Sequence, residues 1–131
     1  MKQILLINDV VGYGKVGMGA MLPILSYLGI PTYSLPTALV SNTLDYGKFN
    51  IQDTTDYIRG TLPVWKELGF SFDAVCTGLM FSDEQAKLVA GYCKEQRRSG
   101  SHFPGYRGTV RIRAGTAVPV FHILSGSRPR R

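Results

Sequence analysis

The first residues whose types and spacing could do chemistry lie near the start of the chain. Asp9 follows an apolar run at residues 4–7, and three glycines then repeat with the spacing G-x-G-x-x-G, at Gly12, Gly14 and Gly17. A carboxylate at the end of a strand can accept a hydrogen bond from a ligand hydroxyl, and a glycine-rich loop lets backbone amides enclose a ligand. This stretch therefore indicates a candidate ligand-binding site.

Three interpretations of these glycines are open at first. A dinucleotide-binding motif has its first glycine directly after the strand and an acidic residue at the end of the second strand. Here residues 9–11 intervene, and the second predicted strand ends in TALVSN with no acid before Asp45, which disfavours a dinucleotide. The glycines could simply permit a tight turn and close helix packing. Alternatively, they enclose a small ligand whose hydroxyl group binds Asp9.

Composition places the chain among globular proteins. Of its 131 residues, 44% are hydrophobic and 18% are charged, which is typical of one modest domain with a core. There is no apolar run near the ~20 residues of a membrane span and no signal-peptide pattern, so we expect a cytoplasmic protein without a membrane partner. Cys76 and Cys93 lack metal-ligand spacing and are predicted to be buried thiols.

Charge divides the chain into two parts. Through Glu95 there are nine acidic residues against six lysines and one arginine, whereas from Gln96 onward there are eight arginines and neither lysine nor acid. Such a change is unusual within one domain. We therefore treat residues 1–98 and residues 99–131 separately.

The first part alternates between strand and helix patterns. We expect strands at residues 2–8, 32–40 and 72–77, and helices at residues 18–28, 53–69 and 83–97. This order predicts an α/β fold with a parallel sheet. Pro36 should make the second strand an edge or an interrupted strand.

Local signals mark the ends of the helices. Asp53 and Asp56 are predicted at the N-cap and N3 positions of the second helix. Ser82 and Gln85 are predicted to form a capping box at the start of the third.

Polar residues follow each predicted strand, at residues 8–9, 41–43 and 77–78. Ligands of open parallel sheets bind beyond the carboxyl ends of the strands. We therefore expect these three segments to share one pocket.

Four separated segments of residues 2–98 together resemble a known family. They are INDVVGYGKVG, LPTALVSN, WKELGFSFDAVCTG and SDEQ, and they are similar to the N-terminal half of pyridoxal/pyridoxamine kinases of the ribokinase-like superfamily. The resemblance implies a three-layer sandwich with a parallel central sheet. It also implies ATP- and Mg²⁺-dependent phosphorylation of the 5′-hydroxymethyl group of pyridoxal, pyridoxamine or pyridoxine, commonly by a homodimer.

The resemblance also implies which residues line the vitamer pocket. Positions that match the family's substrate-binding segments are Asp9, Val16, Gly17, Ser41, Asn42, Thr43 and Leu79. Two positions depart from the family. The family often has Ser-x-His-Thr-Gly where this chain has Ser-Asn-Thr-Leu-Asp, and some members have a ring-stacking tyrosine in place of Leu79. The preferred vitamer therefore stays open, and a hydroxymethylpyrimidine kinase is the alternative.

Residues 99–131 contain no carboxylate, so they offer neither Mg²⁺ ligands nor a carboxylate base. The resemblance implies that the nucleotide-binding region and the catalytic aspartate should follow here. A frameshifted or truncated kinase sequence is favoured, and we predict that this chain alone is inactive. The alternatives are a divergent domain end with strands at residues 109–113 and 117–124, and a basic arm for nucleic acid. His102 and His122 are predicted to bind no metal.

Overall fold

The computed structural model describes residues 3–98 and 122–123. The strand expected at residues 109–113, and all but two residues of the one expected at 117–124, lie outside the described residues. The elements in chain order are β1 (Ile4–Tyr13), α1 (Met18–Tyr27), β2 (Thr32–Asn42), the short 3-10 helix η1 (Leu44–Tyr46), β3 (Ile51–Asp53), α2 (Thr55–Glu67), β4 (Ala74–Thr77), α3 (Asp83–Arg98) and β5 (His122–Ile123).

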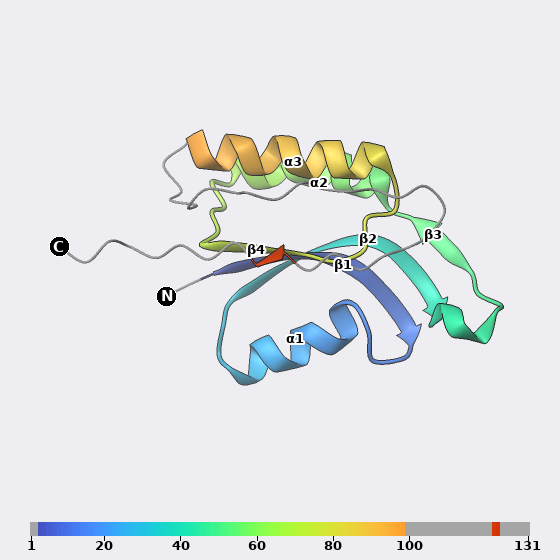
Figure 1. Cartoon of the computed structure of the whole chain (residues 1–131). Coiled ribbons are helices and arrows are strands. Elements are labelled where there is room, and N and C mark those ends of the chain that lie inside the picture. The colour runs from blue at the N-terminus through green and yellow to red at the C-terminus, as the bar shows by residue number, and fades with distance from the viewer. Residues whose placement is uncertain (1–2, 99–121, 124–131) are drawn as a thin grey trace.

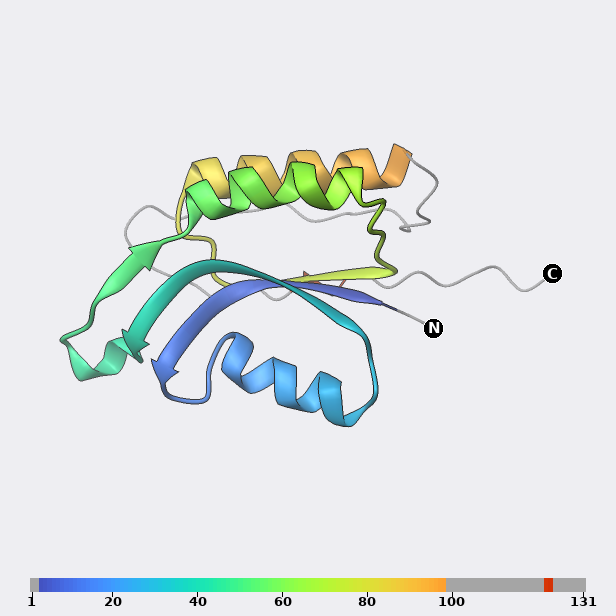
Figure 2. The ribbon, with the colours of Figure 1, turned by 180° about the vertical axis from the view of Figure 1, so that it is seen from behind.

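These elements form three layers. The sheet has the strand order β3-β2-β1-β4-β5. Helix α1 covers one face of the sheet, whereas α2 and α3 lie side by side on the other (Figures 1 and 2). The predicted α/β fold with a layered, ribokinase-like arrangement is therefore confirmed.

The central strands are parallel, as the alternating pattern predicts. β1 pairs in parallel with both β2 and β4, whereas β3 and β5 are antiparallel to their neighbours. β3 was not predicted, because its three residues are too few for a pattern. Pro36 lies opposite Asn8 of β1, and β3 pairs with β2 only at residues 38–40. Proline therefore occupies a place where β2 has a neighbouring strand on one side only.

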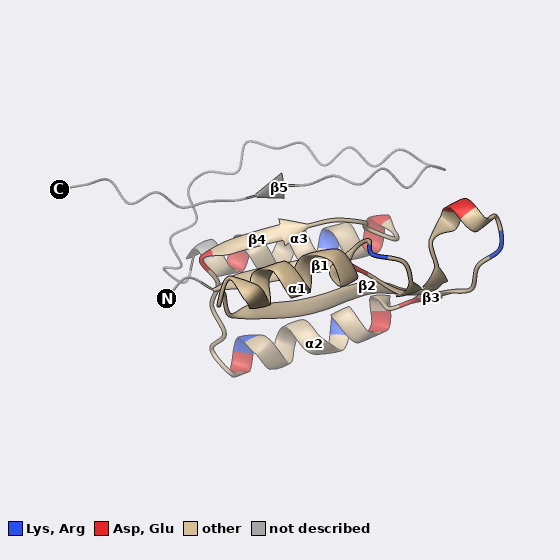
Figure 3. Ribbon diagram, turned by 90° about the horizontal axis from the view of Figure 1, so that it is seen from below, with Lys and Arg blue, Asp and Glu red and all other residues tan. Residues whose placement is uncertain are grey.

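The core has two parts, one on each face of the sheet. Leu5 and Ile7 point toward α2 and α3, and Leu6 between them points toward α1, as the two-residue period of a strand requires. Figure 3 shows that α1 carries no charged residue, whereas α2 and α3 carry acidic and basic residues along their outer surfaces.

β1 is longer than predicted. The sequence suggested an end at Asn8 because Asn, Asp and Gly are depleted in strands, but pairing with β2 continues to Tyr13 after a register shift between Asn8 and Val10. Gly12 therefore lies inside the strand, where a Cβ atom would be 2.8 Å from the Ser41 carbonyl oxygen. The glycines serve partly as strand residues in close contact with β2.

The helix starts at Met18 and Asp83 agree with the prediction. Only α2 differs, because its N-cap is Thr54 in place of Asp53, which puts Asp56 at N2 in place of N3. α2 begins at Thr55, and Asp53 is the last residue of β3. The Asp53 carboxylate still satisfies an amide at the helix start, because Oδ1 accepts from the Thr55 N–H at 2.8 Å. For α3, the Ser82 hydroxyl accepts from the Gln85 N–H at 3.2 Å, which is the first half of the predicted capping box.

Candidate functional site

Asn8 is a buried polar residue that joins β1 to the loop after β4. Its exposed fraction is 4%. Its Oδ1 accepts hydrogen bonds from the Asp9 N–H and the Leu79 N–H, each at 3.0 Å. A Cβ atom at Gly78 would overlap the Asn8 carboxamide, so this contact requires glycine. Asn8 therefore fixes the backbone of β1 at Asp9 and the backbone of the following loop at Leu79.

Asp9 lies at the irregularity where β1 shifts its register against β2. The extra residue belongs to β2, where Thr37 and Ala38 lie opposite Asp9 alone, as in a β-bulge. The Asp9 carboxylate is half-buried, and burial raises its pKa above the usual range. The backbone N–H of Asp9 itself interacts with the carboxylate and lowers the pKa, but burial has the larger effect. Among residues 3–98 and 122–123, no other residue donates a hydrogen bond to this carboxylate. The site thus contains a partly desolvated acceptor without a donor from another residue.

Gly17 lies against Asp9 at the start of α1. A Cβ atom on Gly17 would be 2.6 Å from the Asp9 carboxylate oxygen Oδ1 and 2.5 Å from its carbonyl oxygen. Gly17 also has φ 56° and ψ −134°, a conformation that L-residues with side chains rarely adopt. Both the close contact and the backbone require glycine.

Two further predicted site residues flank this pair. Val16 precedes Gly17 and is 42% exposed, and Leu79 is half-buried beside Gly78. We define the Asp9 site as the residues that meet around this part of β1: Asn8, Asp9, Val16, Gly17, Gly78 and Leu79. The sequence identified the glycine loop and Asp9, and it placed Asn8 and Gly78 at polar strand ends, but it revealed neither the burial of the Asn8 carboxamide nor the close contact that requires glycine at Gly78.

The other predicted site residues lie in the flap, which we define as residues 41–50 between β2 and β3. The Ser41 hydroxyl donates to Asn42 Oδ1 at 2.7 Å and accepts from the Asn50 N–H at 2.8 Å. Asn42 Nδ2 donates to the carbonyl oxygens of Thr43 and Lys48 at 3.1 and 2.9 Å. These side chains therefore hold the flap turn closed on itself.

The structure places the predicted site residues in two groups along β1. Asn42 pairs with Tyr13, which lies four residues beyond Asp9 along β1, or about 13 Å at the rise of an extended strand. An open depression beside the flap is lined by Tyr13, Asn42, Tyr46 and Lys48. The strand ends are staggered because β1 and β2 continue past the point where β4 ends, and a pocket shared by the two groups stays a prediction.

The described residues supply no obvious metal site. Residues 3–98 and 122–123 contain no group of three His, Cys, Asp or Glu side chains that could hold an ion. A search of the same residues found no helix long and apolar enough to cross a membrane.

No protein-family model and no curated protein sequence matches the chain. Solved structures do match. A protein of Bacteroides thetaiotaomicron, provisionally described as a phosphomethylpyrimidine kinase and crystallised with pyridoxal, is 32% identical, with a TM-score of 0.73 over 88% of this chain and 41% of its own. A second crystal form of that kinase matches at 36% identity and a TM-score of 0.70, over 73% of this chain and 33% of the other.

The likeness in fold extends to more distant proteins. Pyridoxal kinase from Leishmania donovani, in complex with ADP and pyridoxamine, is 21% identical, with a TM-score of 0.71 over 76% of this chain and 36% of its own. The chain spans about a third to two-fifths of the length of these three structures. The resemblance predicted from the sequence is therefore confirmed: this chain is similar to part of the pyridoxal kinases and phosphomethylpyrimidine kinases.

Proposed function

We propose that this chain carries the vitamer-binding part of an ATP-dependent kinase that phosphorylates the 5′-hydroxymethyl group of pyridoxal, pyridoxamine or pyridoxine. The observation that carries the proposal is the half-buried Asp9 carboxylate, which receives no hydrogen bond from any other described residue. The similar kinase from Bacteroides was crystallised with pyridoxal, which supports the choice of ligand.

Each residue of the Asp9 site has a role that its chemistry allows. Asp9 accepts a hydrogen bond from a hydroxyl group of the vitamer, which is a strong interaction because the acceptor is charged and partly desolvated. The loop at Val16 and Gly17 lines one side of the ring. Leu79 covers the ring by apolar contact, without the stacking geometry that an aromatic residue would offer.

The flap residues form the second part of the proposed pocket. Ser41, Asn42 and Thr43 keep the flap turn in one conformation through their mutual hydrogen bonds. A rigid turn at the end of β2 would limit how far a bound vitamer extends from Asp9.

The proposal assigns no phosphoryl-transfer step to the described residues. Transfer depends on Mg²⁺ ligands and an anion hole that neutralise the γ-phosphate, and the described residues contain no cluster of potential ligands. Two pyridoxal kinases of the same fold were solved with ADP, which supports ATP as the donor for a complete kinase. We propose that this chain alone binds the vitamer in the cytoplasm but does not phosphorylate it.

The proposal also concerns the two parts of the sequence. We propose that residues 1–98 are the kinase-like part and that residues 99–131 arise from a frameshift or truncation, because acidic residues and lysine are absent from Gln96 onward. Translating the coding DNA in the other two frames downstream of Arg98 tests this. An aspartate-containing strand segment in another frame would support a frameshift, whereas its absence would contradict one.

The binding experiment uses pyridoxine, because it lacks the aldehyde by which pyridoxal reacts with lysines. We expect wild type to bind pyridoxine in calorimetric titrations, and Asp9→Asn to weaken binding about tenfold or more, since a hydrogen bond to a charged group is worth about 1.5–3 kcal/mol. Glu67→Gln, at an exposed carboxylate that ends α2, is the matched control. Equal binding by both variants would contradict the role of Asp9.

A hydroxymethylpyrimidine is the second candidate ligand, favoured by the similarity to a phosphomethylpyrimidine kinase. It also carries a hydroxymethyl group on a flat heterocycle, so Asp9 could bind either compound. Competition between the two ligands for the wild-type chain distinguishes the two assignments. If a large excess of the pyrimidine is needed to displace pyridoxine, the vitamin B6 assignment is supported. If a large excess of pyridoxine is needed to displace the pyrimidine, it is contradicted.

We further propose that the chain forms a homodimer. Helix α1 has no charged residue, and its Ile24, Tyr27 and Leu28 side chains are 61%, 91% and 61% exposed. Exposed apolar surface of this kind favours association. Light scattering after size-exclusion chromatography should give twice the mass of one chain, and a monomer mass at all concentrations would contradict the proposal.

A further inference from the structure

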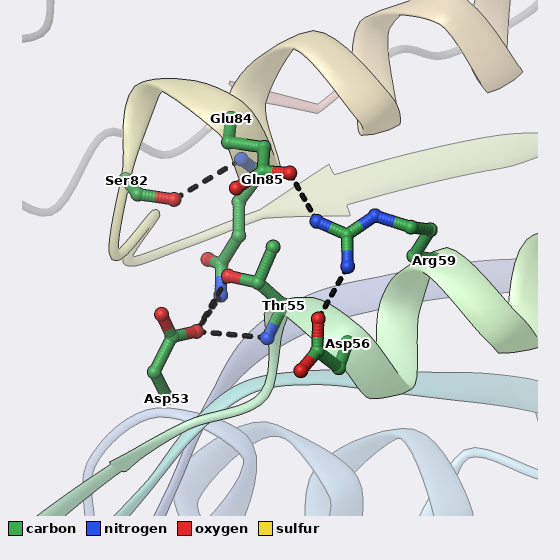
Figure 4. A network of polar contacts seen from close by, with 7 residues as sticks. All are labelled: Asp53, Thr55, Asp56, Arg59, Ser82, Glu84 and Gln85. Carbon is green, nitrogen blue, oxygen red and sulfur yellow. Dashed lines mark hydrogen bonds and ion pairs between the residues drawn. The ribbon is translucent and has the colours of Figure 1, made fainter.

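Gln85 is a fully buried polar residue in the first turn of α3, with an exposed fraction of 0%. Its side-chain oxygen accepts from the Phe81 N–H at 2.9 Å. Its side-chain nitrogen donates to the Thr37 carbonyl oxygen of β2 at 2.7 Å and to Asp53 Oδ1 of β3 at 3.1 Å. One side chain thus joins three separate segments. Figure 4 shows its contact with Asp53.

These contacts are not those of an ordinary capping box. In a capping box the side chain at this position bonds back to the amide of the capping residue itself, here Ser82. Gln85 instead reaches the amide of Phe81 and uses its nitrogen for contacts with β2 and β3. All hydrogen bonds of the Gln85 side chain are therefore made to residues outside α3.

The segment that Gln85 contacts is the loop that carries Leu79. Residues 78–82 connect β4 to α3, and two side chains hold them from opposite ends. Asn8 accepts from the Leu79 N–H at 3.0 Å, and Gln85 accepts from the Phe81 N–H at 2.9 Å. Leu79 and Met80 thus lie in a short stretch of backbone that is fixed on both sides.

Gln85 also connects this loop to the strand that leaves the flap. Asp53 is the last residue of β3, and its Oδ1 accepts from Gln85 and from the Thr55 N–H at 2.8 Å. β3 begins at Ile51, directly after the flap. The same side chain therefore contacts the Leu79 loop and the strand that follows the flap. We call this strand, Ile51–Asp53, the base of the flap.

We propose that Gln85 is a positioning residue that holds the Leu79 loop and the base of the flap in register for vitamer binding. The inference rests on the proposed function, because it assigns the two segments to one ligand. Gln85 does not touch the ligand itself. Its loss should weaken binding through the loop and leave the Asp9 site otherwise unchanged.

The test compares Gln85→Met with Gln96→Met. Gln96 is a second buried glutamine of α3, 8% exposed, and it donates to the Phe70 carbonyl oxygen at 3.1 Å, far from the Leu79 loop along the helix. Both variants remove a buried amide of the same size from the same helix. If Gln85 has only a structural role, both variants should lower the melting temperature, and neither variant should specifically change the Leu79 loop or pyridoxine binding.

Two measurements separate these roles. We expect Gln85→Met to weaken pyridoxine binding at least fivefold and to speed amide hydrogen exchange at Leu79, measured by NMR, about tenfold. The Leu79 amide bonds to Asn8 and not to Gln85, so faster exchange there reports on the whole loop. Gln96→Met should change each quantity less than twofold. Unchanged Leu79 exchange or unchanged binding in Gln85→Met would overturn the inference.

A second pair of variants applies if Gln85→Met does not fold. Asp53 is exposed, so Asp53→Ala should fold and remove one of the contacts of Gln85, and it should weaken pyridoxine binding at least twofold. Asp56→Ala, at an exposed carboxylate in the same helix start that pairs with Arg59, is its control. Equal binding by these two variants overturns the inference, whereas absence of pyridoxine binding by wild type overturns the proposed function itself.

Discussion

Gly17→Ala is the substitution with the most direct structural consequence. A methyl group on this residue would lie 2.5 Å from the Asp9 carbonyl oxygen and 2.6 Å from its Oδ1, well inside normal contact distance. The backbone at φ 56° adds a second cost, since an L-residue is strained there. The contact with backbone cannot be relieved by rotating a side chain, so β1 or the start of α1 must shift.

Gly29→Ala tests a positive φ without a close contact. Gly29 ends α1 with φ 66°, and no atom lies within 4 Å of where its Cβ atom would be. It should lose only the backbone contribution, about 1–2 kcal/mol of unfolding free energy. Overlap at Gly17 adds about 1–3 kcal/mol. We therefore expect Gly17→Ala to cost about 2–5 kcal/mol, or a fall in melting temperature of about 8 °C or more.

The assay is urea denaturation followed by the fluorescence of Trp65, the single tryptophan of the chain. Trp65 packs against the core between the sheet and α2 and should report global unfolding. Gly17→Ala should also abolish pyridoxine binding, because it displaces Asp9, whereas Gly29→Ala should leave binding intact. Equal losses of stability in the two variants would refute the close contact between Gly17 and Asp9.

Three further predictions concern single side chains. Burial raises the pKa of Asp9, so the folded state holds this proton more tightly than the unfolded state does. Stability should therefore fall as the pH rises from the unfolded pKa through the folded pKa. Asp9→Asn should be more stable than wild type in urea at pH 7 and equal to it at pH 3. Gly78→Ala should destabilise the fold by overlap with Asn8, whereas Gly91→Ala, at a helical position with open space, should stabilise it by about 0.5–1 kcal/mol in the same assay. Burial raises the pKa of Cys93 to about 11, so iodoacetamide at pH 8 should label it only after unfolding, and rapid labelling of native protein would contradict this.

Local sequence patterns are enough to predict much of the fold. The run at residues 4–7 and the turn glycines Gly29 and Gly69, both with positive φ, predict a strand and two helix ends without any tertiary information. The parallel pairing of β1, β2 and β4 follows from the alternation of strands with helices. What the sequence did not reveal is the continuation of β1 to Tyr13, since that depends on pairing with β2 and not on local propensity.

The candidate site was less predictable because its geometry depends on contacts between distant segments. Asp9 and Gly17 could be chosen by type and spacing, but their contact could not. Gln85 shows the limit most clearly. Its position three residues after Ser82 predicted a local capping box, and the hydrogen bond from its own amide to Ser82 is present, whereas its side chain is directed to β2 and β3.

Several features that lower the stability of the fold occur together at Asp9, and they indicate the role of the glycine loop. The pairing of β1 with β2 shifts its register beside Asp9, the carboxylate is partly buried without a donor from another described residue, and Gly17 has a conformation that other residues avoid. A loop that only reversed the chain would need none of these, because a solvated carboxylate and an ordinary turn would be more stable. Several destabilising features in one region are typical of a binding site. The same features therefore favour a ligand that donates a hydrogen bond to Asp9 over glycines that serve the turn alone.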